Sequence, residues 1–400
     1  MGGLFVIAQM SATQSGKIPV IIVGLTGEKG GVDRVIEQYI LHADPSEFLI
    51  TAIVRDVPGI LEDPALAGRA SVVRLPYSGR PSMRSELHAG RTIFRETLRA
   101  KSAVLNFHDH YGLLAGLPAW RLRSRSLPMV ATLHMHTSWI PGSYRAKRFM
   151  AVSESYMLRR AKVIVPVSND YARRLGALGF PADQIQVIHN GIDLDAFGQR
   201  SFSRDSARAS LGVKPGQFVF GFAGRFSLQK RPIELIQAVG LLKPEEIKDV
   251  IFLLAGKGVL QEEVEAEIRS QNLMEKVCLV GQISDIQRFY AAIDVLLLPS
   301  SLEGLSMTLL EAMATEVPAL ATRVGGNSET VEDPESGWLM EDWKPETIAA
   351  GIRRVLQNRA EVPFRGAAAR RRIKEEFSVS KMVSETSEIY RRTWLARIRR

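Results

Sequence analysis

Continuous apolar runs rich in β-branched residues recur along this chain, and most of them are followed by a turn and a helical pattern. The first run is IPVIIVGL, at residues 18–25, and it precedes the glycine-rich turn and amphipathic stretch TGEKGGVDRVIEQYI. Such runs are typical of strands in a parallel sheet, where both faces are buried and both must be apolar. The alternation of strand and helix therefore predicts a doubly wound α/β fold.

The same alternation runs through both halves of the chain. We expect further strands at FLITAIVR, AVLNFH, MVATLH and VIVPVS in the first half, and at FVFGFAG, VIFLLAG, KVCLVG, VLLLPS and PALAT in the second. A polar stretch that contains glycine and proline, at residues 199–217, separates the halves. Because 400 residues exceed one ordinary core, we predict Rossmann-like domains at 15–196 and 197–380 and a final helix at 381–400.

Composition narrows the class of protein further. The chain is 46% apolar, as in soluble globular proteins, and its single cysteine, Cys278, excludes a disulfide framework or a cysteine-based zinc site within one chain. A cytoplasmic location is expected, since no secretory signal is apparent and no run reaches the roughly 18 apolar residues that span a bilayer. The net charge of +9 favours anionic partners without choosing among them.

Segments that follow the second-half strands carry residues suited to a pyrophosphate. Arg225 and Lys230 lie in FAGRFSLQKRP, Lys257 lies in LLAGKG, and the turn EGLS precedes an apolar helix. Ligands of open α/β sheets bind beyond the carboxyl ends of the strands. Two cations and the backbone N–H groups of a helix N-terminus, here residues 303–306, would favour an anion at that edge.

Two glutamates, Glu303 and Glu311, stand eight positions apart around the start of that helix. A helix rises about 1.5 Å per residue, so eight positions span roughly 12 Å. That span matches the separation of the two hydroxyl-rich ends of a nucleoside diphosphate sugar, and carboxylates accept hydrogen bonds from vicinal hydroxyls. We therefore predict that Glu311 binds the ribose diol and that Glu303 binds hydroxyls of the donor sugar.

With these motifs in order, the chain resembles the retaining glycosyltransferases of family 4, which have the GT-B fold of two Rossmann-like domains facing each other across a cleft. The resemblance covers nearly the whole chain. It includes GEKGGVDRVI, VLNFHDH, VATLH, VIVPVSNDYARRL, VIHNGIDLDAF, FAGRFSLQKRP, LLAGKG, FYAAIDVLLLPSSLEGLSMTLLEAMA and VGGNSETVEDPESGWL. The chain departs from many relatives in having Leu305 and Ser306 where they have an aromatic residue and a glycine.

The resemblance implies a role for each matching position. Arg225 and Lys230 would clamp the diphosphate, Glu303 and His134 would contact the transferred sugar, and Glu311 would bind the ribose. The remaining donor-binding positions implied are Gly30, Gly31, Gly304, Leu305, Ser306, Lys257, Gln282 and Ile283, the last three near the base. The last helix, SEIYRRTWLARIRR, would pack back onto the first domain.

The implied reaction is same-face substitution, in which the leaving phosphate oxygen takes the acceptor proton, with no metal and no other cofactor. A metal alternative rests on Asp193 and Asp195, which spell the Asp-x-Asp of metal-dependent transferases. A turn at the domain junction explains that pair better. His108, His110 and His136 could suggest zinc, but they lie on separate turns, so we interpret His108 and His110 as lining or packing residues.

Other functions fit fewer of these features. Gly24, Gly27, Gly30 and Gly31, with Asp56 after the next strand, could form a dinucleotide fingerprint, but their spacing is wrong. An epimerase of nucleotide sugars shares the two-domain architecture, and a non-catalytic nucleotide-sugar-binding partner is a third reading. Nucleic-acid binding is not expected, because the basic residues are scattered and no stacking platform is apparent.

Arginine clusters in the first half suggest a contact with anionic lipid. RSELHAGRTIFRETLRAKSA, AWRLRSRSLP and YRAKRFM alternate cations with apolar residues. Ordinary solvated helix faces explain the clusters equally well.

Taken together, the motifs and the resemblance predict a hexosyltransferase of bacterial polysaccharide or glycolipid type. It would use a nucleotide-sugar donor and a glycan or polyprenyl-linked acceptor, and it would lie in the cytoplasm or at the inner face of the membrane.

Overall fold

The computed structural model describes residues 16–27, 30–77, 79, 82–123, 127–136, 145–198, 202–283 and 285–398. Contacts divide the chain into two compact units. The first runs to Gly191 and includes the chain from Val379 onward, and the second is Ile192–Ser378. Each unit holds one six-stranded sheet in which every pair of neighbouring strands is parallel.

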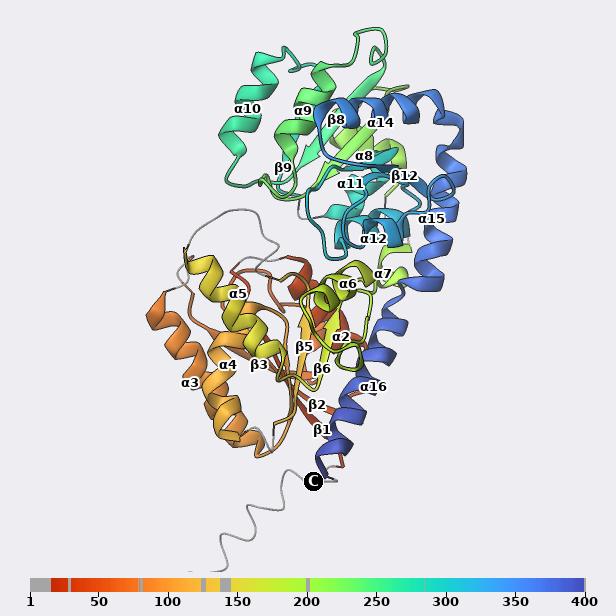
Figure 1. The fold of residues 1–400 in the computed structure, drawn as a ribbon. Coiled ribbons are helices and arrows are strands. Elements are labelled where there is room, and N and C mark those ends of the chain that lie inside the picture. Colours follow the sequence, from red (N-terminus) through yellow and green to blue (C-terminus); the bar gives the residue numbers. More distant parts are fainter. Residues whose placement is uncertain are drawn as a thin grey trace, which may run out of the picture. The chain divides into compact units, whose positions relative to one another are not determined.

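The first unit contains a sheet of order β3-β2-β1-β4-β5-β6 (Figure 1). Its strands are β1 (Ile18–Gly24), β2 (Phe48–Arg55), β3 (Ala70–Leu75), β4 (Val104–Phe107), β5 (Met129–Leu133) and β6 (Val163–Pro166). All residues of β1 and β4 are buried, because these two strands lie in the middle of the sheet and helices cover both faces. The order reverses between β1 and β4, which makes that edge the expected ligand site of a doubly wound sheet.

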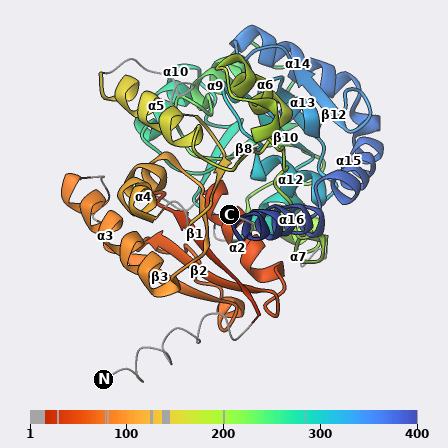
Figure 2. The ribbon, with the colours of Figure 1, turned by 60° about the horizontal axis from the view of Figure 1, so that its bottom comes forward.

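Two groups of helices lie on the first sheet. One group, visible on one side of the sheet in Figures 1 and 2, is α3 (Met83–Ala100), α4 (His110–Arg123) and α5 (Arg145–Leu158), and the other includes α2 (Gly31–His42) and α16 (Val379–Ile398). The unit also has α6 (Asn169–Ala177) and the short 3₁₀ turns η1 (Pro64–Leu66) and η3 (Ala182–Gln184). The sheet and its helices enclose an apolar core.

The last helix, α16, is part of the first unit although it follows the whole second unit in sequence. The ring of Tyr390 packs edge-on against Tyr39 of α2, with ring centroids 5.4 Å apart. The Arg391 guanidinium forms two bonds to the Glu47 carboxylate, at 2.7 and 3.0 Å. An aromatic contact with α2 and an ion pair with the residue before β2 therefore hold this helix on the first unit.

The second unit repeats the topology of the first, with the order β12-β11-β10-β7-β8-β9. Its strands are β7 (Phe218–Ala223), β8 (Val250–Ala255), β9 (Val277–Gly281), β10 (Val295–Leu298), β11 (Ala319–Thr322) and β12 (Gly337–Met340). Here the order reverses between β7 and β10. A second apolar core surrounds this sheet.

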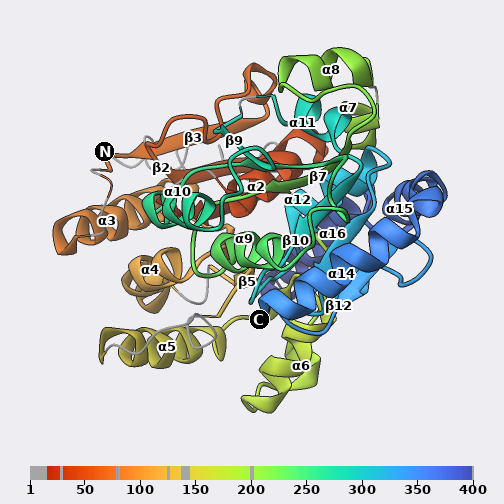
Figure 3. The ribbon, with the colours of Figure 1, turned by 90° about the horizontal axis from the view of Figure 1, so that it is seen from above.

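The helices of the second unit also form layers. Helices α9 (Pro232–Gly240), α10 (Gln261–Ser270) and α14 (Pro345–Gln357) pack side by side, as Figure 3 shows. The others are α7 (Leu194–Gly198), α8 (Arg204–Ser210), α11 (Ile286–Ala292), α12 (Met307–Ala314), α13 (Asn327–Thr330), the turn η4 (Arg359–Glu361) and α15 (Val362–Glu376). Helix α8 packs on α11, and α15 packs on α12.

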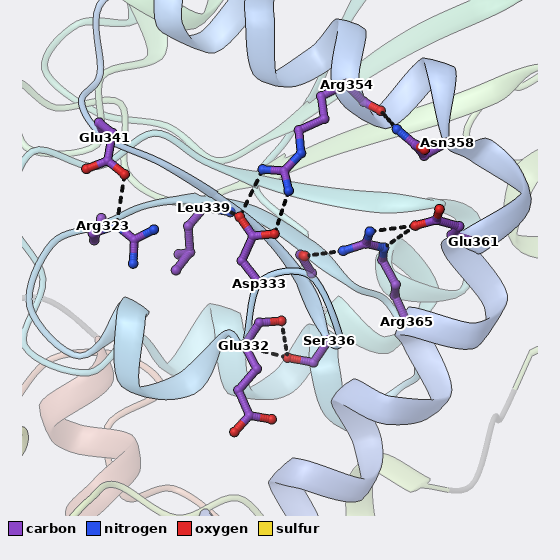
Figure 4. A network of polar contacts seen from close by, with 11 residues as sticks. Arg323, Glu332, Asp333, Ser336, Leu339, Glu341, Arg354, Asn358, Glu361 and Arg365 are labelled. Atoms are coloured by element: carbon purple, nitrogen blue, oxygen red, sulfur yellow. Dashed lines mark hydrogen bonds and ion pairs between the residues drawn. The ribbon is translucent and has the colours of Figure 1, made fainter.

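Polar side chains hold the edge strand β12 in place (Figure 4). The Arg354 guanidinium of α14 forms two bonds to the Asp333 carboxylate, at 2.7 and 2.9 Å, and Asp333 also accepts the N–H of Leu339 at 3.2 Å. From α15, Arg365 donates to the Gly337 carbonyl at 2.6 Å. A four-residue strand thus gains from its neighbouring helices the anchoring that its own short ladder lacks.

Candidate active site

Lys230 and Glu303 meet at the point where the order of the second sheet reverses. Lys230 lies in the loop after β7, and Glu303 lies in the loop after β10. The Lys230 ammonium is 2.6 Å from Glu303 Oε1, and the two side chains are only 16% and 7% exposed. An ion pair of low exposure at this edge provides one cation and one hydrogen-bond acceptor where parallel sheets bind their ligands.

The two loops are also joined through their backbones. The Ser301 N–H donates to the Gln229 backbone carbonyl at 2.8 Å, and the side-chain amide of Gln229 donates to the Leu302 carbonyl at 2.8 Å. Arg231 ends the first loop in the left-handed conformation, and Pro232 then begins α9. These contacts fix the loop backbones on both sides of the Lys230–Glu303 pair.

Two glycines of the loop after β11 pack against the turn before α12. Gly325 has a φ of +53°, and a Cβ there would lie 1.8 Å from the Glu303 carbonyl oxygen. The Gly326 N–H donates to the Gly304 carbonyl at 2.7 Å. Ser306 caps α12 by accepting the Leu309 N–H at 3.4 Å. Gly304, Leu305 and Ser306 are themselves buried, so the turn is packed between the helix it begins and a second, glycine-rich loop.

Glu311 lies inside α12 and is 1% exposed. The Tyr290 hydroxyl of α11 donates to Glu311 Oε2 at 2.8 Å. Glu303 and Glu311 are therefore oriented by different partners, an ammonium in one case and a phenol in the other. The tyrosine was not a predicted site residue, since FYAAID has the pattern of an ordinary buried helix.

The other predicted residues of this unit lie on exposed loops at the same sheet edge. Arg225 and Lys257 are exposed after β7 and β8, and Gln282 and the half-buried Ile283 follow β9. These loops pack closely, because a Cβ at Gly256 would lie 1.9 Å from the Gly224 carbonyl oxygen.

In the first unit, His134 follows β5 and pairs with His108, which follows β4. Nδ1 of His108 is 3.2 Å from Nε2 of His134, and the rings are stacked with centroids 5.4 Å apart. Burial lowers the pKa of His134 to about 4 and the pKa of His108 well below its usual range, where the neighbouring His134 lowers it further. Both rings are therefore neutral near pH 7. The interpretation of His108 as a lining residue did not anticipate this contact.

The predicted Gly30 and Gly31 begin α2. The Gly30 N–H donates to Asp33 Oδ2 at 3.0 Å, and the Thr26 hydroxyl donates to Asp33 Oδ1 at 2.6 Å. Asp33 thus orders both sides of the turn, although Glu28 and Lys29 lie outside the described residues.

Asp109 ties together the loops at the reversal point of the first sheet. Its carboxylate accepts the Leu25 N–H after β1 and the Gly112 N–H of α4. Burial raises the pKa of Asp109 to about 6, although these two N–H groups and the Arg55 guanidinium oppose the shift. Its place after His108 could have suggested a role, but its partner Leu25 is 84 residues distant in sequence.

The residues considered for metal binding have other contacts. His136 Nε2 lies 3.5 Å from Glu154 Oε2 and 3.2 Å from the Ser155 hydroxyl. Asp193 Oδ1 accepts the backbone N–H groups of Asp195 and Ala196, at 2.9 and 3.1 Å, which is a turn before α7. Within the part of the chain that the structure describes, no three His, Cys, Asp or Glu side chains are grouped as metal ligands.

Two protein-family models together match most of the chain. Residues 29–196 match the model described as Glycosyltransferase Family 4, and residues 203–376 match the model described as Glycosyl transferases group 1. The D-inositol 3-phosphate glycosyltransferase of Saccharomonospora viridis is 30% identical over 311 residues, which are 72% of this chain and 70% of that protein. The chain belongs to glycosyltransferase family 4. It is therefore an enzyme that transfers a glycosyl group.

A second relative of this family 4 glycosyltransferase matches over a shorter length. It is the UDP-Gal:alpha-D-GlcNAc-diphosphoundecaprenol alpha-1,3-galactosyltransferase of Escherichia coli, which is 29% identical over 209 residues. The match covers 52% of this chain and 54% of that protein, about half of each.

Solved structures show the same fold. Anabaena HepE in complex with UDP-glucose has a TM-score of 0.78 and 20% identity, with 93% of this chain and 99% of that chain covered. The sucrose-phosphate synthase of Thermosynechococcus elongatus has a TM-score of 0.81 and 21% identity, with 95% and 100% covered. The predicted GT-B fold of two Rossmann-like domains is confirmed. The epimerase alternative is not favoured by these matches.

Proposed function

We propose that this family 4 glycosyltransferase moves a hexosyl group from a nucleoside diphosphate sugar to a hydroxyl of a glycan or polyprenyl-linked acceptor. The anomeric configuration is retained, and no metal or other cofactor is required. The ion pair between Lys230 and Glu303 is the observation that supports this most directly. It provides a cation for the diphosphate beside a carboxylate for sugar hydroxyls, at the edge of the sheet where such ligands bind.

The proposed reaction proceeds on one face of the sugar. The bond between the anomeric carbon and the diphosphate oxygen breaks, and the acceptor oxygen forms its bond to the same face of that carbon. The acceptor proton passes to the departing phosphate oxygen, so no separate base is needed. Lys230 and Arg225 stabilise the negative charge that builds on the diphosphate, and the α12 N-terminus adds a favourable dipole.

The remaining donor contacts follow from position. Glu311 binds the ribose hydroxyls, and the backbone of Gly304, Leu305 and Ser306 faces the diphosphate. Lys257, Gln282 and Ile283 lie near the base. In the first unit, Gly30 and Gly31 allow close approach of the backbone, and His134 contacts the transferred sugar.

The acceptor is assigned to the first unit and is a saccharide on a polyprenyl carrier or a growing glycan. The name of the Escherichia coli relative describes an acceptor of the diphosphoundecaprenol type, which supports the lipid-linked choice. Among the described residues, no helix is both long and apolar enough to cross a bilayer. A cytoplasmic enzyme that meets its acceptor at the inner membrane face would instead use a surface contact.

One face of α3 suits such a contact. Arg84, Leu87, Arg91, Arg95 and Leu98 are all exposed at helical spacing, and the two leucines are 58% and 52% exposed. Arginines can pair with lipid phosphates while leucines enter the acyl boundary. We refer to these five residues as the α3 stripe.

The decisive experiment is a donor screen followed by a transfer assay. Thermal shift with UDP-, GDP- and ADP-hexoses identifies the donor, and the product formed on a polyprenyl-diphosphate-linked saccharide is analysed for anomeric configuration by NMR. We expect an α-linked product from an α-linked donor, at an unchanged rate in excess chelator. An inverted product contradicts retention. Conversion of the donor without acceptor would indicate an epimerase, and binding without turnover a non-catalytic partner.

A further inference from the structure

A continuous chain of hydrogen bonds connects the C-terminal helix to His134 within the first unit. The Asn106 side-chain nitrogen lies 2.7 Å from the Tyr390 hydroxyl of α16 and 3.1 Å from Nε2 of His108. Nδ1 of His108 in turn lies 3.2 Å from Nε2 of His134. Four side chains from three separate parts of the sequence are therefore linked in a row.

Neighbouring strands hold this row in place. Asn106 lies in β4, and the Thr132 hydroxyl of the adjacent β5 donates to Asn106 Oδ1 at 3.2 Å. His108 continues from β4, and its backbone N–H donates to the Val23 carbonyl of β1 at 2.9 Å. Asn106 is fully buried, and His108 and Tyr390 are 6% and 1% exposed. Solvent is thus largely excluded, and the hydrogen bonds between these side chains determine which atom carries each proton.

The direction of the hydrogen bonds from Asn106 to His134 follows from the Asn106 amide, which is the donor at that end. A neutral imidazole has one N–H and one acceptor nitrogen, and burial keeps both histidines neutral. The Asn106 amide nitrogen can only donate, and its two protons lie near three atoms, the Tyr390 hydroxyl at 2.7 Å and Thr132 Oγ1 and Nε2 of His108 at 3.1 Å each. A bond from this amide to Nε2 of His108 places the proton of His108 on Nδ1. That Nδ1–H donates to Nε2 of His134, so the proton of His134 lies on its own Nδ1.

We propose that Asn106 and His108 are positioning residues that fix the tautomer of His134 and make its Nδ1–H the donor to an oxygen of the transferred sugar. This inference rests on the proposed function, because it assigns His134 to the sugar. It adds a reason for the amide in β4, since a carboxylate or an apolar side chain there would not donate to His108. The orientation of His134 is then set by the core of the first unit.

Ring-nitrogen NMR tests the tautomer directly. The full chain is labelled with ¹⁵N-histidine, and the His134 signals are assigned by comparison with His134→Gln at pH 7. We expect a protonated Nδ1 and an unprotonated Nε2. A proton on Nε2 would overturn the proposal, because that pattern follows from an amide rotated by 180°, which reverses every bond in the row.

Two variants test the cause. His108→Phe keeps a ring against His134 but removes the hydrogen bond, so His134 should lose its single tautomer. Asn106→Asp replaces the donor with an acceptor and should move the His134 proton to Nε2. Tyr390→Phe removes the hydroxyl at the other end of the row and serves as the control, with the wild-type tautomer expected. An unchanged His134 signal in both test variants would overturn the proposal.

Kinetics of the same variants test the consequence. We expect His108→Phe to lower kcat by about tenfold, the value of one hydrogen bond made to the sugar, with a smaller change in the donor KM. Wild-type kcat in a variant whose His134 tautomer has changed would overturn the positioning role and leave the proposed function intact. Absence of transfer by the wild-type enzyme with every donor would instead refute the proposed function, whatever the NMR result.

Discussion

Lys230 and Glu303 form a mutually paired unit at the edge of the second sheet, with 2.6 Å between the ammonium and Oε1. Their loops follow β7 and β10, which are neighbours in the sheet only because the strand order reverses there. In the proposed reaction Lys230 contacts a phosphate and Glu303 accepts hydrogen bonds from sugar hydroxyls. Each residue also offsets the charge of the other, so removing one affects both.

This pairing predicts a non-additive effect on catalysis. Lys230→Ala should lower kcat/KM by about 10²- to 10³-fold, because a cation that stabilises the leaving diphosphate is lost and an unpaired carboxylate faces an anionic ligand. Glu303→Ala should cause a comparable loss. The double variant should lose much less than the product of the two, since the partners act as a unit.

Steady-state kinetics of the four proteins measure this coupling. Lys243→Ala, which changes an exposed lysine of the same unit, is the control for charge and should retain wild-type activity. Circular dichroism shows whether each variant is folded. Near-normal turnover of folded Lys230→Ala, or losses that simply multiply, would refute the proposed role of the pair.

Tyr290 supports Glu311, which gives a second prediction. Tyr290→Phe removes the hydroxyl that donates to Glu311 Oε2 at 2.8 Å. A ribose contact is made equally in the ground state and the transition state, so we expect the donor KM to rise about fivefold to tenfold while kcat changes little.

Tyr39→Phe provides the matched control for that variant. It also removes a buried tyrosine hydroxyl, one that lies 3.2 Å from the Ser387 hydroxyl, but in the first unit. It should cost a similar amount of stability, about 1 kcal/mol, with no change in the donor KM. An unchanged KM in Tyr290→Phe would show that Glu311 does not depend on this bond or does not bind donor.

Asp109 predicts how stability depends on pH. Its pKa is raised from 3.8 to about 6 in the folded chain by burial. The folded state therefore binds this proton more tightly than the unfolded state. The resulting stabilisation is fully present below about pH 4 and is lost as pH rises through 6, a change of about 3 kcal/mol for two pKa units.

Asp109→Asn has no proton to release at this position. The free energy of unfolding of the wild type minus that of the variant, from denaturant titrations between pH 4 and 7, should fall as pH rises. Other titrating groups, including the histidines with lowered pKa, cancel in that difference. A difference that is constant across this range would show that Asp109 does not titrate near pH 6.

The central strands and the edge strands β6 and β9 could be predicted from sequence, but the other two edge strands, β3 and β12, were missed. A central strand is buried on both faces, so its residues form a long apolar run, as in β1. Strand β3, ASVVRL, is mostly half-buried and includes an arginine. Strand β12 has four residues and begins with glycine. Neither has the continuous apolar pattern on which the prediction relied.

Some residues of the candidate site could likewise be predicted from sequence, and others could not. Lys230 and Glu303 could be found because each follows an apolar run, and the carboxyl ends of parallel strands share one edge. Tyr290 and Asn106 could not be found this way, and Asp109, although it follows β4, was not predicted. Each lies in or next to a stretch with an ordinary buried pattern, and its importance depends on a partner between 21 and 284 residues distant. Such contacts exist only once the sheet order is known.

The α3 stripe predicts binding to anionic membranes. Arg84, Arg91 and Arg95 are exposed on the same helix face as Leu87 and Leu98. Each cation near an anionic surface contributes about 1 kcal/mol, so replacing the three arginines with glutamine should weaken binding by about 100-fold. The test is co-sedimentation with vesicles of anionic and of neutral lipid at low salt, where screening is weakest.

A control variant with the same change in net charge separates this surface from the general excess of positive charge. Lys243, Lys248 and Arg269 are exposed in the second unit, and their replacement with glutamine should leave vesicle binding nearly unchanged. Transfer to a short water-soluble acceptor should be normal in both triple variants, because neither changes the proposed site. Equal loss of binding in the two variants would mean that only net charge matters, and no sedimentation of the wild type with anionic vesicles would remove the membrane contact.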